Sequence, residues 1–206
     1  MIYQNKRRHW SINKQRIIRT LLNNPQGNLT KYQVAKQSMC KYSTAHKILK
    51  QLQIDGYLQG TKITEYEKLI HAWKTWQIKP IRDQYFLKNP FRILEKTKLN
   101  YAMTTYIAEN LIQKYLFPSK IQFYINPADR IEWRNLILAD DGFVGRGNVT
   151  LLFGDEHAFY HSFLIDSMKL VSIPQLILDL LNEGASCTEA ANMLMLRVRD
   201  SAIPKL

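Results

Sequence analysis

The stretch that decides the fold runs from Thr30 to Thr64: TKYQVAKQSMCKYSTAHKILKQLQIDGYLQGTKIT. Thr30 and Gln33 have the spacing of a capping box, which predicts the start of a helix. The polar segment 38–42 has the length of a helix-turn-helix connection, and Ser43 is the expected N-cap of a second helix. The stretch therefore predicts two helices joined by a tight turn.

The second of these helices has two distinct faces. Its apolar residues recur at helical spacing and predict one buried side: Ala45, Ile48, Leu49 and Leu52. Polar and basic residues take the opposite side and its flanks: Ser43, His46, Lys47, Lys50 and Gln51. Gly56 predicts the helix end, and 57–58 and 63–64 predict two short strands around a turn. The whole is typical of a winged helix-turn-helix whose second helix enters the DNA major groove. The plain alternative is an amphipathic hairpin with solvated lysines.

The charge of the chain is unevenly distributed. Its 206 residues carry a net charge of +12. Residues 1–82 hold 16 lysines and arginines against three acids, whereas the remainder holds 13 against 14. Because binding to phosphates is driven by concentrated positive charge, this partition favours nucleic acid as the partner of the first segment. A membrane surface is the competing partner, but no helix pairs a basic face with an aromatic lipid-seeking face.

Composition narrows the class of protein. A hydrophobic share of 46% is typical of a globular chain. No apolar run approaches the roughly 20 residues that span a bilayer, and the N-terminal residues lack the apolar region of a secretory signal. Cys40 and Cys187 are isolated, which indicates a reduced, cytoplasmic protein without a cysteine metal site.

The flanks of the motif complete an expected N-terminal domain, residues 1–79. Ser11 is the expected N-cap of a first helix that ends near Asn24, and Arg7 and Arg8 precede it as a basic arm suited to the minor groove. A fourth helix is expected from residue 64 or 65 to about 79.

Residues 80–206 are expected to form a small mixed α/β domain, which makes the fold class α+β with two domains. The strands expected there are 102–103, 120–126, 148–153, 159–165 and 169–172. The helices expected there are 89–97, 105–115, one opened by Asn126-Pro127, one from Pro174 to about 184, and 186–199. In strand 120–126, Ile121, Phe123 and Ile125 are expected to be buried and to alternate with exposed residues.

The second domain offers weak patterns for catalysis. Asp155, Glu156, His157 and His161 cluster within seven residues. No third rigid ligand follows from their spacing, so a polar hairpin turn explains them better than a metal site. Neither a phosphate-binding loop nor a nucleophile elbow occurs. We therefore expect no enzyme, no catalytic residue, no metal and no cofactor. The alternative is a metal-dependent nuclease that uses the winged helix as a substrate anchor, with Asp155, Glu156 and His157 in its site.

Three segments carry a resemblance to a known family. They are LTKYQVAKQSMCKYSTAHKILKQLQIDGYLQGTKI, GNVTLLFGDEHAFY and VSIPQLILDLLNEGASCTEAANML. The chain resembles winged-helix regulators related to the AbiEi-like antitoxins of type IV toxin–antitoxin systems. The family's C-terminal signature matches Val171, Ser172, Pro174, Leu178, Asp179, Leu180, Ala190 and Ala191, with Ile173 inserted between Ser172 and Pro174. The resemblance implies an autoregulatory DNA-binding domain, a C-terminal antitoxin or sensing domain, and a nucleotidyltransferase-like toxin as partner.

We therefore expect a sequence-specific regulator of transcription that binds double-stranded DNA and forms a homodimer. A protein-interaction module with the wing against a partner chain is a further alternative. The expected DNA contacts are Arg7, Arg8, Lys31, Lys36, Lys41, Ser43, Thr44, His46, Lys47, Lys50, Gln51 and Lys62.

Overall fold

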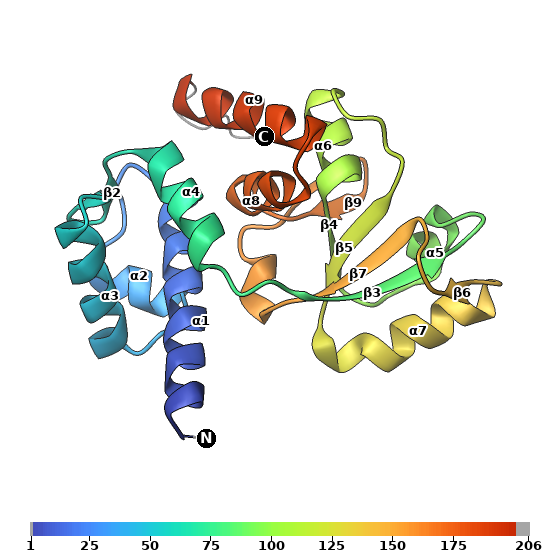
Figure 1. Cartoon of the computed structure of the whole chain (residues 1–206), viewed down its shortest axis with the longest axis horizontal. Coiled ribbons are helices and arrows are strands. Elements are labelled where there is room, and N and C mark those ends of the chain that lie inside the picture. The colour runs from blue at the N-terminus through green and yellow to red at the C-terminus, as the bar shows by residue number, and fades with distance from the viewer. Residues whose placement is uncertain (1, 201–206) are drawn as a thin grey trace. The chain divides into compact units, whose positions relative to one another are not determined.

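The computed structural model describes residues 2–200, with side chains described for residues 12–198. The protein is mixed α+β, with more helix than strand and a seven-stranded sheet within that range. It divides into two compact units (Figure 1). The helical unit comprises the residues up to Ile78, Ile173–Gly184 and the residues from Ala191, and the sheet unit comprises Lys79–Ser172 and Ala185–Ala190. The sequence-based division at residues 79/80 stays a prediction, and it does not anticipate that Ile173–Gly184 groups with the N-terminal residues.

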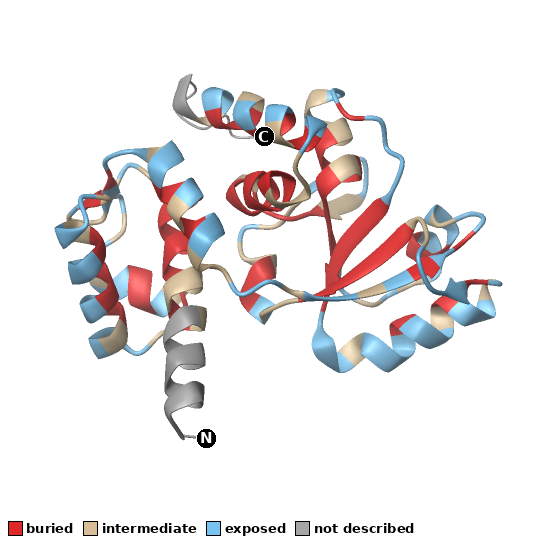
Figure 2. Ribbon diagram, in the orientation of Figure 1, coloured by how far each residue is buried: buried red, intermediate tan, exposed pale blue. Residues whose placement is uncertain are grey.

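The helical unit is built around one apolar core. Its elements are α1 (Ile2–Leu22), α2 (Lys31–Gln37), α3 (Tyr42–Ile54), β1 (Leu58–Gln59), β2 (Lys62–Ile63), α4 (Tyr66–Trp76) and α8 (Ile173–Glu183). Helix α1 packs against α2, α3 and α4, and α8 packs against α4 and α1. Figure 2 shows the buried residues along the sides of α1, α3 and α4 that face one another. The largest buried side chains include Ile17, Ile18, Leu21, Leu22, Leu69, Ile70 and Trp73.

Helix α1 begins earlier than the sequence predicts. It runs from Ile2, so Ser11 lies inside the helix and is not its N-cap. The backbone of Arg7 and Arg8 belongs to this helix as well, and the prediction of a separate arm is wrong; their side chains lie outside the described residues. The physical reason is that no glycine or proline interrupts 2–22, and lysine, arginine and glutamine favour helix over an extended arm.

The predicted helix ends are largely confirmed. The Thr30 hydroxyl accepts from the Gln33 N–H at 3.2 Å, and the Gln33 side chain accepts from the Thr30 N–H at 2.8 Å, as a capping box requires. Gly56, at φ +79°, ends α3. Ser43 is not the N-cap of α3, because the helix begins at Tyr42, two residues earlier than an N-cap at Ser43 predicts, and Lys41 occupies the cap position without a side-chain hydrogen bond.

The sheet unit contains a mixed sheet in the order β6-β3-β7-β5-β4-β9-β8. The pairs β5–β7 and β4–β9 are parallel and the others are antiparallel. The strands are β3 (Ile81–Phe86), β4 (Tyr101–Thr104), β5 (Ile121–Ile125), β6 (Phe143–Val144), β7 (Val149–Phe153), β8 (Phe163–Ile165) and β9 (Met168–Leu170). The helices are α5 (Phe91–Lys96), α6 (Thr105–Gln113), α7 (Arg130–Ala139) and the start of α9 (Ser186–Asp200), with short 3-10 helices η1 (Pro127–Asp129) and η2 (Glu156–Phe159).

Three expectations for this unit need correction. Strand β3 has no counterpart in the sequence prediction. All five residues of β5 are buried, so its predicted alternation is wrong, because the strand lies between β4 and β7 in the middle of the sheet (Figure 2). The strand expected at 159–165 is reduced to β8, and η2 replaces the expected hairpin turn. Within the described residues, no helix has both the length and the apolar character needed to cross a membrane.

Candidate nucleic-acid interface

The α2–α3 pair has a precisely defined connection. The buried Ser38 hydroxyl donates to the Val34 carbonyl at 2.7 Å, which closes the end of α2. Met39 then adopts φ +55°, and the Cys40 N–H reaches back to the Ala35 carbonyl at 2.9 Å. This is the left-handed helix ending that usually takes glycine. The chain thus turns within four residues and starts α3 against α2.

The two faces of α3 are as expected. Its four predicted core residues are at most 1% exposed: Ala45, Ile48, Leu49 and Leu52. They pack toward α1 and α2. Burying a side chain of this size contributes about 1.5–3 kcal/mol, so the register of α3 is strongly determined. The opposite face is consequently directed to solvent.

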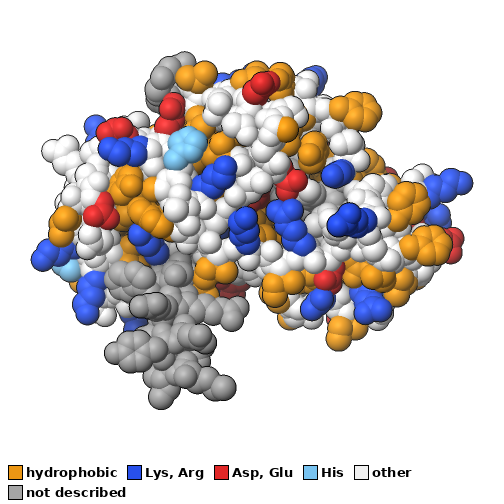
Figure 3. All heavy atoms as spheres, viewed as in Figure 1, with side chains coloured by type: hydrophobic (Ala, Val, Ile, Leu, Met, Phe, Trp, Pro, Cys, Tyr) orange, Lys and Arg blue, Asp and Glu red, His pale blue; other side chains and the backbone are white. Residues whose placement is uncertain are grey.

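The structure places the predicted contact residues mostly on the surface of the helical unit. The exposed ones are Lys36, Lys41, Ser43, His46, Lys47, Lys50, Gln51 and Lys62, while Lys31 and Thr44 are half-buried. Figure 3 shows lysine, arginine and histidine side chains along the outer side of the region where α3 lies. Ser43, Lys47 and Lys50 share one stripe at i, i+4 and i+7. The expected stripe is therefore presented on a single helix face.

The electrostatics of this face are one-sided. Residues 31–54 contain five lysines and no aspartate or glutamate. Among the described residues none of these five lysines forms an ion pair, in contrast with Lys68, whose ammonium lies 3.4 Å from Glu65. The nearest acid in sequence, Asp55, accepts a hydrogen bond from the Gln51 amide at 2.8 Å. The face can therefore neutralise phosphates without first breaking an internal ion pair, although a base contact by Gln51 has to compete with Asp55.

Sequence reasoning missed an aromatic row beside these lysines. The Tyr32 and Tyr42 ring centroids are 6.3 Å apart, and those of Tyr42 and His46 are 5.9 Å apart. Tyr32 is 67% exposed and Tyr42 is 49% exposed. Two large exposed aromatic rings at a polar helix face are unusual for a purely solvated surface and suit contact with sugars or thymine methyl groups. The sequence signal for this row is the i, i+4 spacing of Tyr42 and His46. The prediction of a turn over residues 38–42 places Tyr42 outside the helix and so does not use this spacing.

The β1–β2 hairpin is held firmly to the loop after α1. Its turn is two residues, Gly60-Thr61, shorter than predicted. The Thr61 hydroxyl donates to the Leu29 carbonyl at 2.6 Å, and the Ile63 N–H donates to the Pro25 carbonyl at 3.0 Å. These bonds fix the position of Lys62 relative to the α2–α3 pair.

The anchoring of the hairpin gives a test on glycine. Gly27 has φ +77°, and a Cβ there would lie 2.8 Å from the backbone of Lys62. Gly60 has φ +68° but nothing within 4 Å of its missing Cβ. We expect Gly27→Ala to lower the free energy of unfolding by about 2–3 kcal/mol and Gly60→Ala by only about 1 kcal/mol, the cost of the left-handed backbone alone. Urea denaturation of both variants measures the difference, and equal losses would contradict the close packing of the hairpin.

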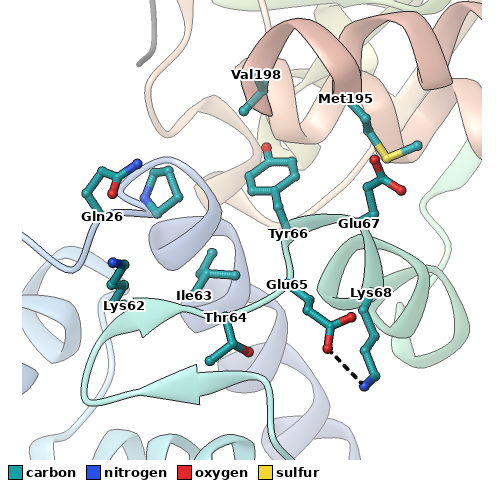
Figure 4. Close-up of a pocket in the computed structure, with 11 residues that line it drawn as sticks. Gln26, Lys62, Ile63, Thr64, Glu65, Tyr66, Glu67, Lys68, Met195 and Val198 are labelled. Atoms are coloured by element: carbon teal, nitrogen blue, oxygen red, sulfur yellow. Dashed lines mark hydrogen bonds and ion pairs between the residues drawn. The ribbon is translucent and has the colours of Figure 1, made fainter. Parts of the chain in front are cut away.

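A groove lies beside the hairpin in the same unit (Figure 4). It has a volume of about 440 Å³ and is lined by residues 25–26, 62–68, Met195 and Val198. Tyr66 projects toward Val198, and its hydroxyl is buried with no hydrogen-bond partner among the described residues. Burial raises the pKa of Tyr66 well above its ordinary value. On folding, the hydroxyl therefore loses its hydrogen bonds to water and gains none to another described residue.

Tyr66→Phe should therefore stabilise the protein. An unsatisfied buried hydroxyl costs about 1–3 kcal/mol, so its removal is expected to raise the free energy of unfolding by about 1 kcal/mol. Because the native pKa is raised, the wild type binds more protons when folded and loses stability as pH rises above about 10, the ordinary tyrosine value. Tyr66→Phe should lose less stability than the wild type as pH rises above about 10. Thermal unfolding at neutral and alkaline pH checks this, and a destabilised variant would indicate that the hydroxyl has a partner.

The residues of the nuclease alternative do not gather into a metal site. Within the described part of the chain, no cluster of three or more histidine, cysteine, aspartate or glutamate side chains could hold a metal ion. His157 is buried and stacks on Tyr160 with centroids 4.6 Å apart, while exposed His161 contacts the same ring at 4.4 Å. Asp155 is half-buried and Glu156 is exposed. Both imidazoles are thus occupied by packing on one tyrosine.

Comparison with known proteins adds no relative: no family model, no curated protein and no solved structure matches the chain.

Proposed function

We propose that the chain is a transcriptional regulator that binds double-stranded DNA in a sequence-specific manner through a winged helix. In this proposal α3 enters the major groove, α2 and Lys41 lie against the phosphate backbone, and β1–β2 is the wing that carries Lys62. The observation that carries it is the exposed face of α3, which combines a polar and aromatic rim with a cationic stripe that forms no ion pair within the described part of the chain.

The residues divide by role. Lysines with mobile ammonium groups neutralise phosphates and set affinity: Lys31, Lys36, Lys41 and Lys62. The side chains at the centre of the exposed stripe lie where base edges are read: Ser43, His46, Lys47 and Lys50. Tyr32 and Tyr42 extend this stripe toward α2. Such a division requires that binding has both a salt-dependent and a sequence-dependent part.

Selection from a pool of random duplexes tests the proposal. The protein should enrich a defined sequence, and its affinity for that sequence should fall steeply as salt concentration rises. Enrichment without salt dependence, or salt dependence without any enriched sequence, would contradict it. Absence of binding to any duplex would favour a protein-interaction module, and salt dependence without an enriched sequence would favour a non-specific polyanion binder.

We further propose that this regulator is a cytoplasmic, autoregulatory antitoxin that acts as a homodimer. The support is the sequence resemblance, together with the limited surface of a single winged helix, which makes paired half-sites favourable. The partner implied is a nucleotidyltransferase-like toxin. Co-expression with the product of a neighbouring gene of that class should relieve its toxicity, and failure to do so would leave a free-standing regulator.

A further inference from the structure

The sheet unit contains a groove of about 640 Å³ that no part of the proposed function uses. One wall is β3, the second is the start of α7, and the third is the connection from β6 to β7. Its lining residues are Arg82, Asp83, Gln84, Tyr85, Arg130, Arg134, Val144, Gly145 and Arg146. Figure 3 shows cationic and apolar side chains interspersed where α7 and β6 lie.

The groove is strongly cationic. Four arginines and one carboxylate, that of Asp83, line it, so the lining carries a net charge of +3. Arg82 precedes Asp83 in β3, so its side chain leaves the strand on the opposite face. The Asp83 carboxylate accepts two hydrogen bonds from Arg130, one from Nε and one from Nη2, each at 2.9 Å. Its negative charge is therefore already matched by Arg130. Among the described residues, neither Arg134 nor Arg146 forms an ion pair.

Arg130 and Arg134 are held in place by the packing of α7. Trp133 is buried and its ring centroid lies 4.9 Å from that of Phe123 on β5, which seats the helix on the sheet. The Arg130 guanidinium also lies over the Phe153 ring at 4.8 Å. Arg134 follows Arg130 by four residues, so both point from the same side of α7. The Arg130 guanidinium is thus held along one wall, and Arg134 extends from the same wall.

Arg146 is presented by a loop that glycines shape. A Cβ on Gly147 would lie 2.3 Å from the Tyr85 carbonyl oxygen, so only glycine allows this close approach to β3. Gly145 has φ +143°, and its N–H donates to the Gln84 carbonyl at 2.9 Å. The two contacts hold the loop on the outer edge of β3, where β6 pairs only with Tyr85 and Phe86. Arg146, between these two glycines, lines the groove from this loop.

The uncharged groups of the lining are donors as well. Burial first, and then the nearby Asp83 carboxylate, raises the pKa of Tyr85. Its phenol thus keeps its proton and can donate. The exposed Gln84 adds an amide. Guanidinium groups match phosphate oxygens in a two-pronged geometry, and clusters of them select multiply charged phosphate ligands.

We propose that this groove binds a small ligand that carries two or more phosphate groups. Its volume lies in the range of about 300–1,000 Å³ that small-molecule sites take. The phosphate groups come either from an inorganic chain or from a nucleotide.

Isothermal titration of the full-length protein, without DNA, tests the site with inorganic tripolyphosphate, ATP and adenosine. Tripolyphosphate and ATP should bind and adenosine should not. Tighter binding of ATP than of tripolyphosphate identifies a nucleotide as the natural class, and equal binding identifies the phosphate chain alone. Because the cationic face of α3 can also attract tripolyphosphate, variants of the groove arginines are needed to assign the binding to this site.

The variant Arg134→Gln with Arg146→Gln should weaken tripolyphosphate binding at least tenfold, while the Asp83–Arg130 pair stays intact. Lys98→Gln with Lys120→Gln removes the same charge from exposed positions of the same unit and should change binding less than twofold. Arg134→Lys with Arg146→Lys keeps the charge and should still lose affinity, because a point charge lacks the guanidinium fork. Circular dichroism verifies folding of each variant.

Absence of tripolyphosphate binding would overturn the proposal. An equal loss of tripolyphosphate affinity in the Arg134→Gln/Arg146→Gln variant and in the Lys98→Gln/Lys120→Gln control would also overturn it. A single-stranded oligonucleotide that binds more tightly than tripolyphosphate and displaces it would also overturn it, in favour of a nucleic-acid track.

Discussion

Replacing both Lys47 and Lys50 by alanine is expected to weaken duplex binding by tenfold or more and to flatten its salt dependence. Each lysine that contacts a phosphate releases condensed counterions, and removing two such contacts should reduce the slope of log affinity against log salt by about two. Both ammonium groups are exposed on the free face of α3, and neither forms an ion pair among the described residues, so the alanines should not disturb the fold. Fluorescence anisotropy across a salt series measures both quantities.

The matched control is Lys88→Ala with Lys120→Ala. These lysines are exposed in the sheet unit, and their loss changes the net charge by the same amount. If the control flattens the salt slope as much as the α3 variant, the effect is one of overall charge. An α3 variant whose affinity and slope equal those of the wild type would remove α3 as the DNA-binding element.

Arg19→Ala is expected to have the largest effect on stability. Arg19 is 5% exposed on α1, and its Nε donates to the Gln175 amide oxygen on α8 at 2.9 Å. The Gln175 nitrogen in turn donates to the Asp179 carboxylate at 2.9 Å. The guanidinium also lies over the buried Trp73 ring at 5.3 Å. Removing it leaves the buried Gln175 and Asp179 without that cation, and breaking a buried charged network costs about 3–5 kcal/mol.

Urea denaturation measures this loss. Lys74→Ala, an exposed position on α4, should change the free energy of unfolding by less than about 0.5 kcal/mol. Arg19→Met retains an apolar stem over Trp73 and should recover part of the loss, which separates packing from charge. A cost for Arg19→Ala no greater than that for Lys74→Ala would show that the network does not hold α8. Asp179 belongs to the C-terminal signature of the sequence resemblance, so this experiment also assigns that residue a structural role.

Local signals in the sequence predicted the helical unit well. The Thr30/Gln33 capping box, the Gly56 helix end and the buried stripe of α3 follow from interactions within a few residues, and short-range chemistry decides them. The same reasoning went wrong at Ser11 and Ser43, because a residue with cap chemistry is also tolerated inside a helix when its flanks favour one. Five of the predicted contact side chains on α3 are exposed, since the apolar face of α3 determines which way its polar face points: Ser43, His46, Lys47, Lys50 and Gln51.

By itself the sequence determined the helix-turn-helix elements, the segregation of positive charge in residues 1–82 and most helix boundaries. Only the tertiary structure decided the rest. The residues of β3 mix polar and apolar side chains without a clear strand pattern, and only the pairing with β7 and β6 identifies the segment as a strand. The packing of α8 on α4 and the four-arginine groove both join residues distant in sequence. Such contacts depend on how whole elements pack, and no short-range spacing encodes them.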